Sequence, residues 1–357
     1  MPAKSGIRPR TTGIYFLRSP AAVTETFPLS LLLIILLALI FDYINGFHDT
    51  ANAIATSLAT GALAPRTAVI LAAGMNLLGA FTFTGVALTI AEGIITPYAL
   101  LQNPRAVTAA LLAAVCWNLL TWYRGLPSSS SHALVGALAG ATLAACGPGG
   151  VNTGGLCNIL QSLILSPPLA LLAGFTTMLI ITLYARLCRL QGGLYNRFRQ
   201  LQRLGAALQA FSHGTNDAQK TMGIITLALV LAGNQETFTV PLWVKICSAL
   251  ALALGTARGG WRIIRTVGRG ITPLDPPAGF AADLGSGAVI LGATLWGLPV
   301  STTHVISSSI TGVGLTRGKG AVHWSTVGKI LLAWLFTLPA SAAMGAAFYF
   351  LCLALAP

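Results

Sequence analysis

Charged residues are scarce in this sequence. Only 8% of its 357 residues are Asp, Glu, Lys or Arg, 55% are hydrophobic, and the mean hydropathy is +0.77. Soluble domains carry about 25% charged residues, so a water-soluble fold of this length would lack the polar side chains to cover its surface. The basic residues stand in short strings between long apolar runs, which argues against a nucleic-acid partner. The composition indicates an all-α polytopic protein embedded in a lipid bilayer.

Cysteine is also sparse, and its spacing indicates no metal site. The six cysteines are scattered, most of them within or at the ends of apolar runs where they would pack as small hydrophobic residues. Cys146 and Cys157 flank a Gly-rich loop and would pair only if that loop lies outside the cytoplasm. No cofactor is predicted.

Long apolar runs dominate what is present. Residues 1–26 form a basic tail, predicted to be mobile rather than a signal peptide, because the run from Leu29 to Ile40 continues into a polar motif without a cleavage site. Ten hydrophobic segments follow, at 27–60, 66–95, 104–123, 131–147, 163–188, 205–232, 240–257, 280–298, 301–316 and 326–355. The fourth and the ninth fall short of the roughly 20 apolar residues that span a bilayer. Interrupted segments at matching places in two halves indicate the binding site of a transporter.

The two halves share motifs. NGFHDTANA at 45–53 aligns with HGTNDAQKT at 213–221, and GLPSSSSH at 125–132 aligns with GLPVSTTH at 297–304, at nearly equal offsets. Two motifs that recur in the same order predict an internal duplication. Because each copy holds five segments, an odd number, the second copy must enter the membrane from the opposite side. The predicted fold therefore consists of two inverted five-segment repeats.

This organisation divides the chain into a tail, 1–26, a first repeat, 27–188, a basic cytoplasmic linker, 189–204, and a second, inverted repeat, 205–357. Basic strings lie around the linker, after the seventh segment and after the ninth segment, on one predicted face. That face is assigned to the cytoplasm because basic loops stay inside. The opposite face includes 145–162 and 233–240, which contain no Lys or Arg. This arrangement leaves a basic N-terminus outside, against the same rule.

Asp42, Asp49 and Asp217 lie inside apolar segments. A carboxylate at membrane depth costs a few kcal/mol, and it persists where it faces a cavity, binds a cation or takes up a proton. A helix-capping Asp is the alternative for a single residue, but Asp49 and Asp217 occupy equivalent places in two copies, which favours a site. Asp42 precedes Asp49 by two helical turns, so it either lines the same helix face or is an interfacial residue.

Polar neighbours surround these carboxylates. They are Asn45, His48, Asn52, Asn216, Gln219 and Lys220. Amide and carboxylate oxygens are suitable ligands for Na⁺, so Asp42, Asp49, Asn52, Asn216 and Asp217 are candidate ion-coupling residues. Lys220 could contact an anion, neutralise Asp217 or extend to the membrane surface. His48 is either a proton relay or a hydrogen-bonded packing residue.

The second motif pair is rich in hydroxyl groups. Ser128 to Ser131 follow a proline and precede His132, and Ser301 to Thr303 precede His304. Proline and hydroxyl residues are typical of a helix start, whose free N–H groups and positive dipole end favour anions. A single run could be an N-cap or a helix-packing surface. Two runs in symmetric positions favour a site for a tetrahedral oxyanion.

The two motif types together suggest a coupling mechanism. An anion beside buried carboxylates is repelled unless a cation binds between them or the carboxylates are protonated. Anion and cation binding would then favour each other, which is the physical basis of a symporter.

NGFHDTANAIAT (45–56), FSHGTNDAQKTMGI (211–224) and GLPVSTTHVISSS (297–309) closely resemble the inorganic phosphate transporter (PiT) family, in particular its bacterial low-affinity branch. The resemblance implies broken helices and re-entrant hairpins, often in a homodimer. It implies a multi-pass protein of the bacterial plasma membrane that moves inorganic phosphate, free or as a metal-phosphate complex, with Na⁺ or H⁺. The implied phosphate ligands are Ser129, Ser130, Ser131, Ser301, Thr302 and Thr303. The implied Na⁺ ligands are Asp49, Asn52 and Asp217.

The sequence departs from the common family pattern at His48 and Lys220, where Asn is usual. Both departures resemble the bacterial branch, in which proton coupling occurs. A sulfate permease of the same fold is the alternative function. An intramembrane lipid phosphatase would use the Ser and His clusters as nucleophile and base, but the clusters are duplicated and neither stands in a Gly-x-Ser-x-Gly turn. The sequence therefore predicts a transporter and not an enzyme.

Overall fold

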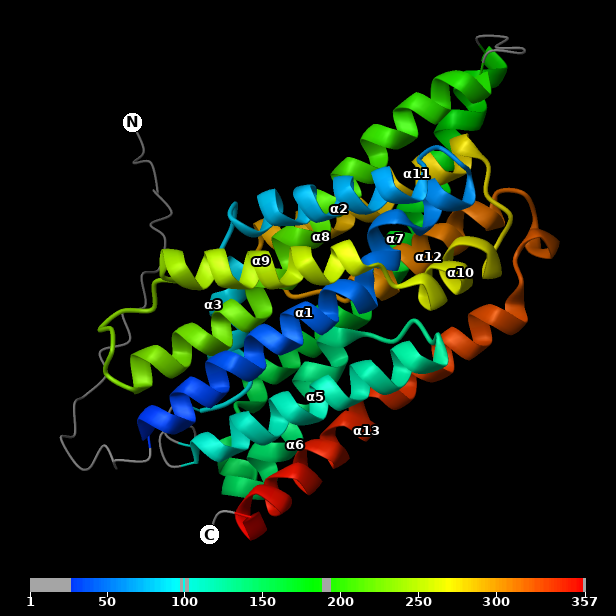
Figure 1. The fold of residues 1–357 in the computed structure, drawn as a ribbon. Coiled ribbons are helices and arrows are strands. Elements are labelled where there is room, and N and C mark those ends of the chain that lie inside the picture. The colour runs from blue at the N-terminus through cyan, green and yellow to red at the C-terminus, as the bar shows by residue number, and fades with distance from the viewer. Residues whose placement is uncertain (1–26, 97–98, 100–102, 188–193, 356–357) are drawn as a thin grey trace, which may run out of the picture.

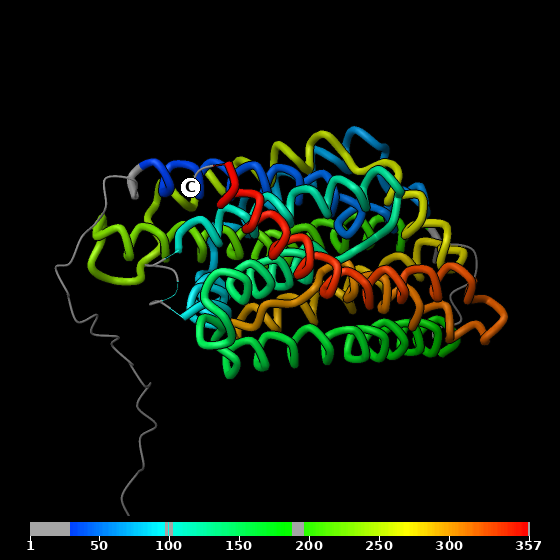
Figure 2. Tube along the Cα trace, turned by 90° about the horizontal axis from the view of Figure 1, so that it is seen from below, coloured from blue at the N-terminus to red at the C-terminus, as the bar shows by residue number. Residues whose placement is uncertain are grey.

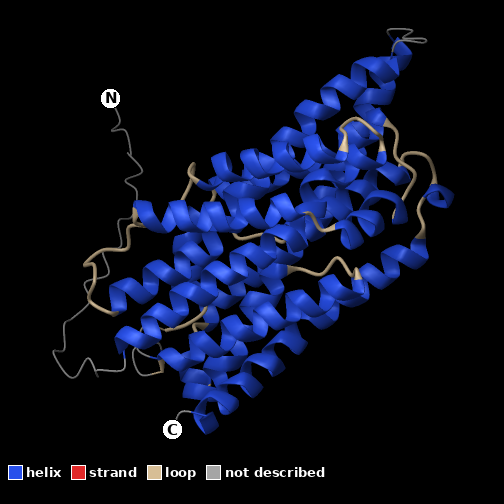
Figure 3. Ribbon diagram, in the orientation of Figure 1, coloured by secondary structure: helices blue, strands red, loops and turns tan. Residues whose placement is uncertain are grey.

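The computed structural model describes residues 27–96, 99, 103–187 and 194–355. Its regular elements are helices, and an isolated bridge joins Ile95 to Val151 (Figure 3). The first half contains α1 (Phe27–Ala59), α2 (Pro65–Ala80), α3 (Gly85–Gly93), α5 (Pro104–Arg124), α6 (Ser130–Cys146), η1 (Pro148–Gly150) and α7 (Thr153–Leu187). The second half contains α8 (Leu194–Leu231), α9 (Leu242–Arg258), α10 (Trp261–Gly270), α11 (Pro276–Leu295), α12 (Thr302–Leu315), η2 (Lys319–Ala321) and α13 (Trp324–Leu355).

Each of the ten predicted segments coincides with a helix or a bent helix pair. By length and composition, α1, α5, α7, α11 and α13 are candidate membrane spans. The pairs α2–α3 and α9–α10 pass the same test together and bend by 72° and 71°. The fourth and ninth segments form α6 and α12, which have 17 and 14 residues and are too short to span alone. The broken elements implied by the family resemblance are therefore present.

Helix ends differ from the predicted boundaries where polar or prolyl residues extend a helix beyond its apolar core. α7 begins at Thr153, ten residues before the predicted start, and continues through Pro167 and Pro168. α8 begins at Leu194, so residues 194–204 of the predicted linker form its first turns. Arginines and glutamines fill these turns, and hydropathy alone could not assign them to a helix. The predicted mobile tail, 1–26, lies outside the described residues.

Close contacts between α1 and α9 recur between α8 and α2. At the first crossing, a Cβ on Gly46 would meet the backbone at Leu252, and at the second a Cβ on Gly214 would meet the backbone at Asn76. The partner helices supply glycines of their own, Gly255 and Gly79, which face Tyr43 and Phe211. Glycine is required at these positions because the backbones approach too closely for a side chain.

The outer helices form a second pair of close contacts, in which a short helix of one half packs against a long helix of the other half. Gly140 of α6 lies against the backbone of Ala342 in α13, and Gly312 of α12 lies against the backbone of Leu171 in α7. In Figure 1, α1 and α8 run in opposite directions along the long axis of the molecule, as do α7 and α13. These observations agree with an internal duplication in which each half packs against equivalent helices of the other half. The inverted relation of the repeats stays a prediction.

The segments that carry the basic strings, namely the start of α8, α10 and the connection from α12 to α13, lie toward one end of the helix bundle, on the right of Figure 1. Arg199 and Arg203 of α8 donate to the carbonyl oxygens of Gly61 and Ala62 in the α1–α2 loop. Arg262 of α10 donates to the carbonyl of Tyr123 at the end of α5, and Arg317 pairs with Asp275 at 2.6 Å. The basic strings predicted to share one face therefore meet at this end.

Leucines on α1, α7 and α13 are exposed, as expected of a surface in contact with lipid. The tube view in Figure 2 shows α7 and α13 along the outside of the bundle. The disulfide considered for Cys146 and Cys157 is absent, since both thiols are free. The Cys146 sulfur instead contacts the Asn103 amide at 3.3 Å.

Candidate functional site

A polar layer divides two apolar clusters near the middle of the bundle. On α1 the larger cluster ends at Phe47 and the second begins at Ala51. On α8 the second cluster ends at Ala210 and the larger one resumes at Ala218. The intervening residues carry the acidic motifs of both halves and are buried. The repeated motifs therefore meet in one interior layer.

The two hydroxyl runs open α6 and α12 as predicted. Ser129 is the N-cap of α6 and accepts a hydrogen bond from the backbone N–H of His132. Ser301 is the N-cap of α12 and accepts from the N–H of His304. Each cap satisfies one of the N–H groups that a helix start leaves without an intrahelical acceptor.

These two helix starts face each other inside the protein. Ser131 donates to the carbonyl of Val300 at 2.9 Å, and the rings of His132 and His304 stack with centroids 4.6 Å apart. Trp334 of α13 stacks on the other face of this pair, 3.8 Å from the His304 ring. Two helix N-termini that converge in the interior present their positive dipole ends to a common region.

Asp49 connects the two hydroxyl runs. Ser130 of α6 donates to its Oδ2 at 2.9 Å, and Thr303 of α12 donates to its Oδ1 at 3.4 Å. The His48 ring also lies 2.6 Å from Oδ1. One carboxylate from α1 therefore holds hydroxyl groups from both half-helices.

Asp217 is the corresponding carboxylate of α8, and it has a different set of partners. Thr302 and Asn45 both donate to its Oδ2 at 3.3 Å. Lys220 lies 2.5 Å from Oδ1, and His213 lies 3.1 Å from Oδ2. Lys220 is 1% exposed, so it neutralises Asp217 and does not extend to the membrane surface.

Amide groups complete the layer. Asn52 donates from Nδ2 to Thr302 at 3.2 Å and to Thr303 at 2.9 Å, and its Oδ1 has no hydrogen-bond partner. The Oδ1 of Asn45 is also buried without a partner. Ligand atoms of Asp49, His213 and Asp217 lie within 4.8 Å of one another, a spacing that could accommodate a cation. Oxygen-rich surroundings of this kind suit a hard cation.

Asp42 lies in the same buried interior, where Thr221 of α8 donates to its Oδ2. Its Oδ1 has no partner. The alternative of an interfacial Asp near a helix end is therefore wrong, because the residue is fully buried among other helices. The layer and its immediate surroundings thus hold the carboxylates of Asp42, Asp49 and Asp217 together with the ammonium group of Lys220.

Two of the predicted site residues, Asn216 and Gln219, form hydrogen bonds away from the carboxylates. Asn216 accepts from the backbone N–H of Val300 and donates to Thr294, so it supports the segment that precedes α12. Gln219 accepts from the N–H groups of Val86 and Ala87 at the start of α3. Both residues hold helix starts in place, and neither contacts Asp49 or Asp217 through these bonds.

Two residues that contact the site, His213 and Thr121, were not predicted from the sequence. His213 stands four residues before Asp217, a spacing that places both on one helix face and could have identified it. Thr121 of α5 lies 3.0 Å from His48 Nε2 and accepts from Ser128 at 2.8 Å. His48 is therefore hydrogen-bonded on both ring nitrogens. No sequence pattern marked Thr121, since it is an isolated threonine in a largely apolar helix outside both motif pairs.

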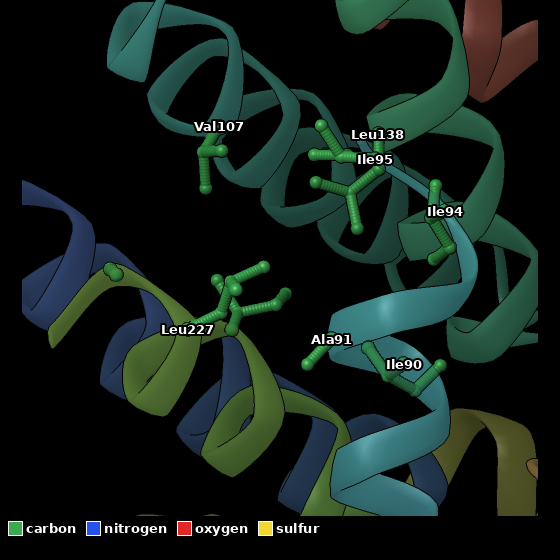
Figure 4. A pocket seen from close by; sticks show the side chains of 9 residues that line it. Ile90, Ala91, Ile94, Ile95, Val107, Leu138 and Leu227 are labelled. Carbon is green, nitrogen blue, oxygen red and sulfur yellow. The ribbon is translucent and has the colours of Figure 1, made fainter. Parts of the chain in front are cut away.

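An apolar cavity lies apart from this layer (Figure 4). Its walls come from α3, α5, α6 and α8, and they include Ile90, Ile94, Val107, Leu138 and Leu227. These residues belong to the larger apolar cluster, on the side of the layer away from the basic end. Without polar donors or charges, this cavity has no means of binding an ion.

Comparisons with known proteins agree with this geometry. Residues 45–191 and 182–345 match the Phosphate transporter family. A Bacillus subtilis protein named "Probable low-affinity inorganic phosphate transporter" is 52% identical over 90% of this chain and 96% of its own length. A Rhizobium meliloti protein of the same name is 44% identical over 92% of this chain and 97% of its own.

A solved structure titled "The sodium-dependent phosphate transporter" superposes with a TM-score of 0.81. It is 26% identical and covers 92% of this chain and 100% of its own. These relatives are named as transporters, which agrees with the prediction that the chain is not an enzyme. With both family matches and the near full-length relatives in agreement, the chain belongs to the phosphate transporter family.

Proposed function

We propose that this protein is a secondary active transporter that couples the movement of inorganic phosphate across the bacterial plasma membrane to an inward flow of H⁺ or Na⁺. The observation that carries the proposal is the meeting of two hydroxyl-rich helix starts at Asp49, with Ser130 on one side and Thr303 on the other. The family and the names of the relatives support phosphate as the anion.

Phosphate would bind between the two helix starts. Its ligands would be the hydroxyls of Ser129, Ser130, Ser131, Ser301, Thr302 and Thr303, together with the first N–H groups of α6 and α12. Helix N-termini bind anions through such N–H groups. Because the site is buried, each of these hydrogen bonds would be formed in a low-dielectric environment and would exclude water.

Coupling follows from competition for the same hydroxyl groups. Ser130 and Thr303 donate to Asp49, and Thr302 donates to Asp217. Phosphate can take these donors only if the carboxylates release them, and the negative carboxylates also repel the anion. A proton or Na⁺ on Asp49 or Asp217 removes both obstacles. The bound cation therefore raises the affinity for phosphate, and phosphate raises the affinity for the cation.

The ion-coupling residues in this proposal are Asp42, Asp49, Asn52 and Asp217. A sodium ion would use the unpartnered oxygen of Asn52 together with Asp49 and Asp217, and a proton would bind a carboxylate directly. His48 and Lys220 already engage these carboxylates, which favours H⁺ over a full set of sodium ligands. The end with the basic side chains would face the cytoplasm.

Phosphate uptake into proteoliposomes under imposed gradients tests the proposal. We expect an inward pH or sodium gradient to drive accumulation and an ionophore that collapses that gradient to stop it. Asp49→Asn and Asp217→Asn should each abolish driven uptake while the protein remains in the membrane. Normal driven uptake in both variants would refute the coupling role of these carboxylates.

Sulfate is the second candidate anion, since its shape and charge suit the same helix starts. Phosphate is partly protonated at neutral pH and can donate a hydrogen bond to Asp49, whereas sulfate cannot. Excess sulfate should therefore compete poorly with labelled phosphate. Equal competition would favour the sulfate alternative.

Two further expectations belong to the same proposal. A metal-phosphate complex would place its metal among Asp49, His213 and Asp217, and phosphate uptake measured with and without Mg²⁺ tests this expectation.

A homodimer is the expected assembly, and the mass of the purified protein in detergent tests it.

A further inference from the structure

A fourth buried carboxylate lies outside the polar layer. Asp283 of α11 is fully buried, and it falls within the predicted segment 280–298. Thr56 of α1 donates to its Oδ1 at 2.6 Å, whereas its Oδ2 is buried without a hydrogen-bond partner. None of the ion pairs among the described residues includes Asp283. Burial of an uncompensated carboxylate is costly, so this group needs a cation or a proton.

Asp283 lies between the polar layer and the basic end. Thr56 follows Asp49 by seven residues, or about 10 Å of helix rise toward the end of α1. Asp283 follows the N-cap of α11, Asp275, by eight residues, or about 12 Å. Asp275 forms its ion pair with Arg317 at the basic end. The carboxylate therefore sits roughly midway along the path from the site to that surface.

Polar side chains line this path on both sides of Asp283. Toward the site, Gln209 donates to the carbonyl of Asn52 at 3.1 Å and accepts from Ser286 at 2.8 Å. Toward the basic end, Thr60 donates to the side-chain oxygen of Gln202 at 2.7 Å. Thr60 in turn lines a surface cavity together with Arg199 and Asp275. The cavity of Figure 4, on the opposite side of the polar layer, is lined by apolar residues.

Helix α8 packs closely against α11 beside this carboxylate, and Gln202 lies against Gly279 of α11, one turn before Asp283. A Cβ on Gly205 would lie 3.3 Å from the Cβ of Asp283, so α8 and α11 approach closely here. Gln202 lies one turn before Gly205, and its Nε2 is buried without a partner. The charged and histidine residues on the helices that pack around Asp283 are Asp42, His48 and Asp49 on α1, Arg186 on α7, Arg197, Arg199, Arg203, His213, Asp217 and Lys220 on α8, Asp275 on α11 and His304 on α12.

We propose that Asp283 is a proton-binding site that receives the coupling proton after the polar layer and passes it to the cytoplasmic end. This inference rests on the proposed function and specifies H⁺ as the coupling ion. Thr56 donates its O–H group to the carboxylate. A hydroxyl donor suits a carboxyl group that alternates between charged and neutral forms, whereas Na⁺ requires several oxygen ligands.

The proton balance is simple. Protonation forms an O–H bond at Oδ2 and removes the one negative charge of the carboxylate. Release of that proton to water in the surface cavity restores the charge and leaves the carboxylate ready for the next cycle. No oxidant or other reactant takes part. The proton enters with phosphate on one side and leaves on the other, so the transport cycle supplies and removes it.

Asp283→Asn is the decisive variant, because Asn keeps the size and the Thr56 contact but cannot carry a proton. In proteoliposomes with an internal pH dye, we expect phosphate–phosphate exchange to stay within about twofold of the unmodified protein. Net uptake driven by a pH gradient should fall at least tenfold, and fewer protons should enter per phosphate. Glu236→Gln is the control, because it removes an exposed carboxylate in the loop between α8 and α9, outside the proposed path. It should leave both rates unchanged.

Several results would overturn the assignment. Full net uptake by Asp283→Asn would show that the carboxylate carries no proton, and equal loss of exchange and net uptake would indicate a structural role. Loss of sodium-driven uptake in Asp283→Asn, with no proton entry in the unmodified protein, would assign a sodium site instead. Absence of all phosphate transport by the unmodified protein would refute the proposed function rather than this inference.

Infrared spectroscopy gives an independent measurement that a structural role would not change. The unmodified protein should show carbonyl bands of buried, protonated carboxylic acids as pH is lowered, and Asp283→Asn should lose the component that comes from Asp283. Identical bands in both proteins would contradict the proposal.

Discussion

Substitution of Lys220 by Gln tests the electrostatics of the site most sharply. The ammonium lies 2.5 Å from Asp217 Oδ1, and both groups are at most 1% exposed. Removal of one partner from a buried ion pair costs about 3–5 kcal/mol, because it leaves the other charge uncompensated. We expect Lys220→Gln to lower the stability, and Asp217→Asn added to it to restore part of the loss, because the second change removes the carboxylate charge that was left without its partner.

Thermal unfolding of the two single variants and the double variant forms a double-mutant cycle. We expect a coupling energy of at least about 2 kcal/mol between the two positions, below the full cost of a broken pair because His213, Asn45 and Thr302 also contact the carboxylate. Lys245→Gln is the matched control, since Lys245 is outside every ion pair among the described residues and should change little. A Lys220→Gln protein no less stable than this control would refute the reasoning.

The same variant should change the ion dependence of transport. Loss of the ammonium leaves Asp217 available to an external cation, so sodium should bind in its place. A deficit of about 3 kcal/mol corresponds to more than a hundredfold change in an equilibrium constant. We therefore expect Lys220→Gln to transport phosphate poorly without sodium and to be stimulated at least tenfold by it. An absence of sodium stimulation would contradict the assigned role of Lys220.

Three further predictions concern the packing and the anion site. Ser130→Ala combined with Thr302→Ala should raise the phosphate KM in uptake assays, and an unchanged KM would remove these hydroxyls from the site. Gly140→Ala should lower the unfolding temperature, because its Cβ would meet the α13 backbone and such overpacking costs about 1–3 kcal/mol. Gly74→Ala, which meets nothing within 4 Å, should be neutral or stabilising by up to about 1 kcal/mol, and a reversed order of the two unfolding temperatures would contradict the packing.

The motif pairs predicted much of the architecture because each motif carries its own physical signal. Proline followed by hydroxyl residues predicts a helix start, and α6 and α12 do begin at Ser130 and Thr302. Apolar length predicted the ten segments. The polar first turns of α8 could not be predicted in this way, because their arginines lie beyond the apolar core of that helix.

Site contacts between distant segments were harder to predict. The pairing of Ser130 with Asp49 joins the two motifs of the first half, and only tertiary packing brings Thr303 to the same carboxylate. Asp283 has no counterpart in the first half, so the internal repeat gave no reason to single it out. Its partner Thr56 lies 227 residues away in the chain.

Binding measurements on the purified protein test the central claim most directly, which is that Asp49 and Asp217 withhold hydroxyl donors from phosphate until a cation binds these carboxylates. Phosphate affinity should rise with the concentration of the coupling cation, and cation affinity should rise with phosphate by the same factor. In Asp49→Asn this mutual dependence should disappear, which also separates it from the protonation of phosphate itself. Phosphate affinity that is independent of both sodium and pH in the unmodified protein would contradict the account.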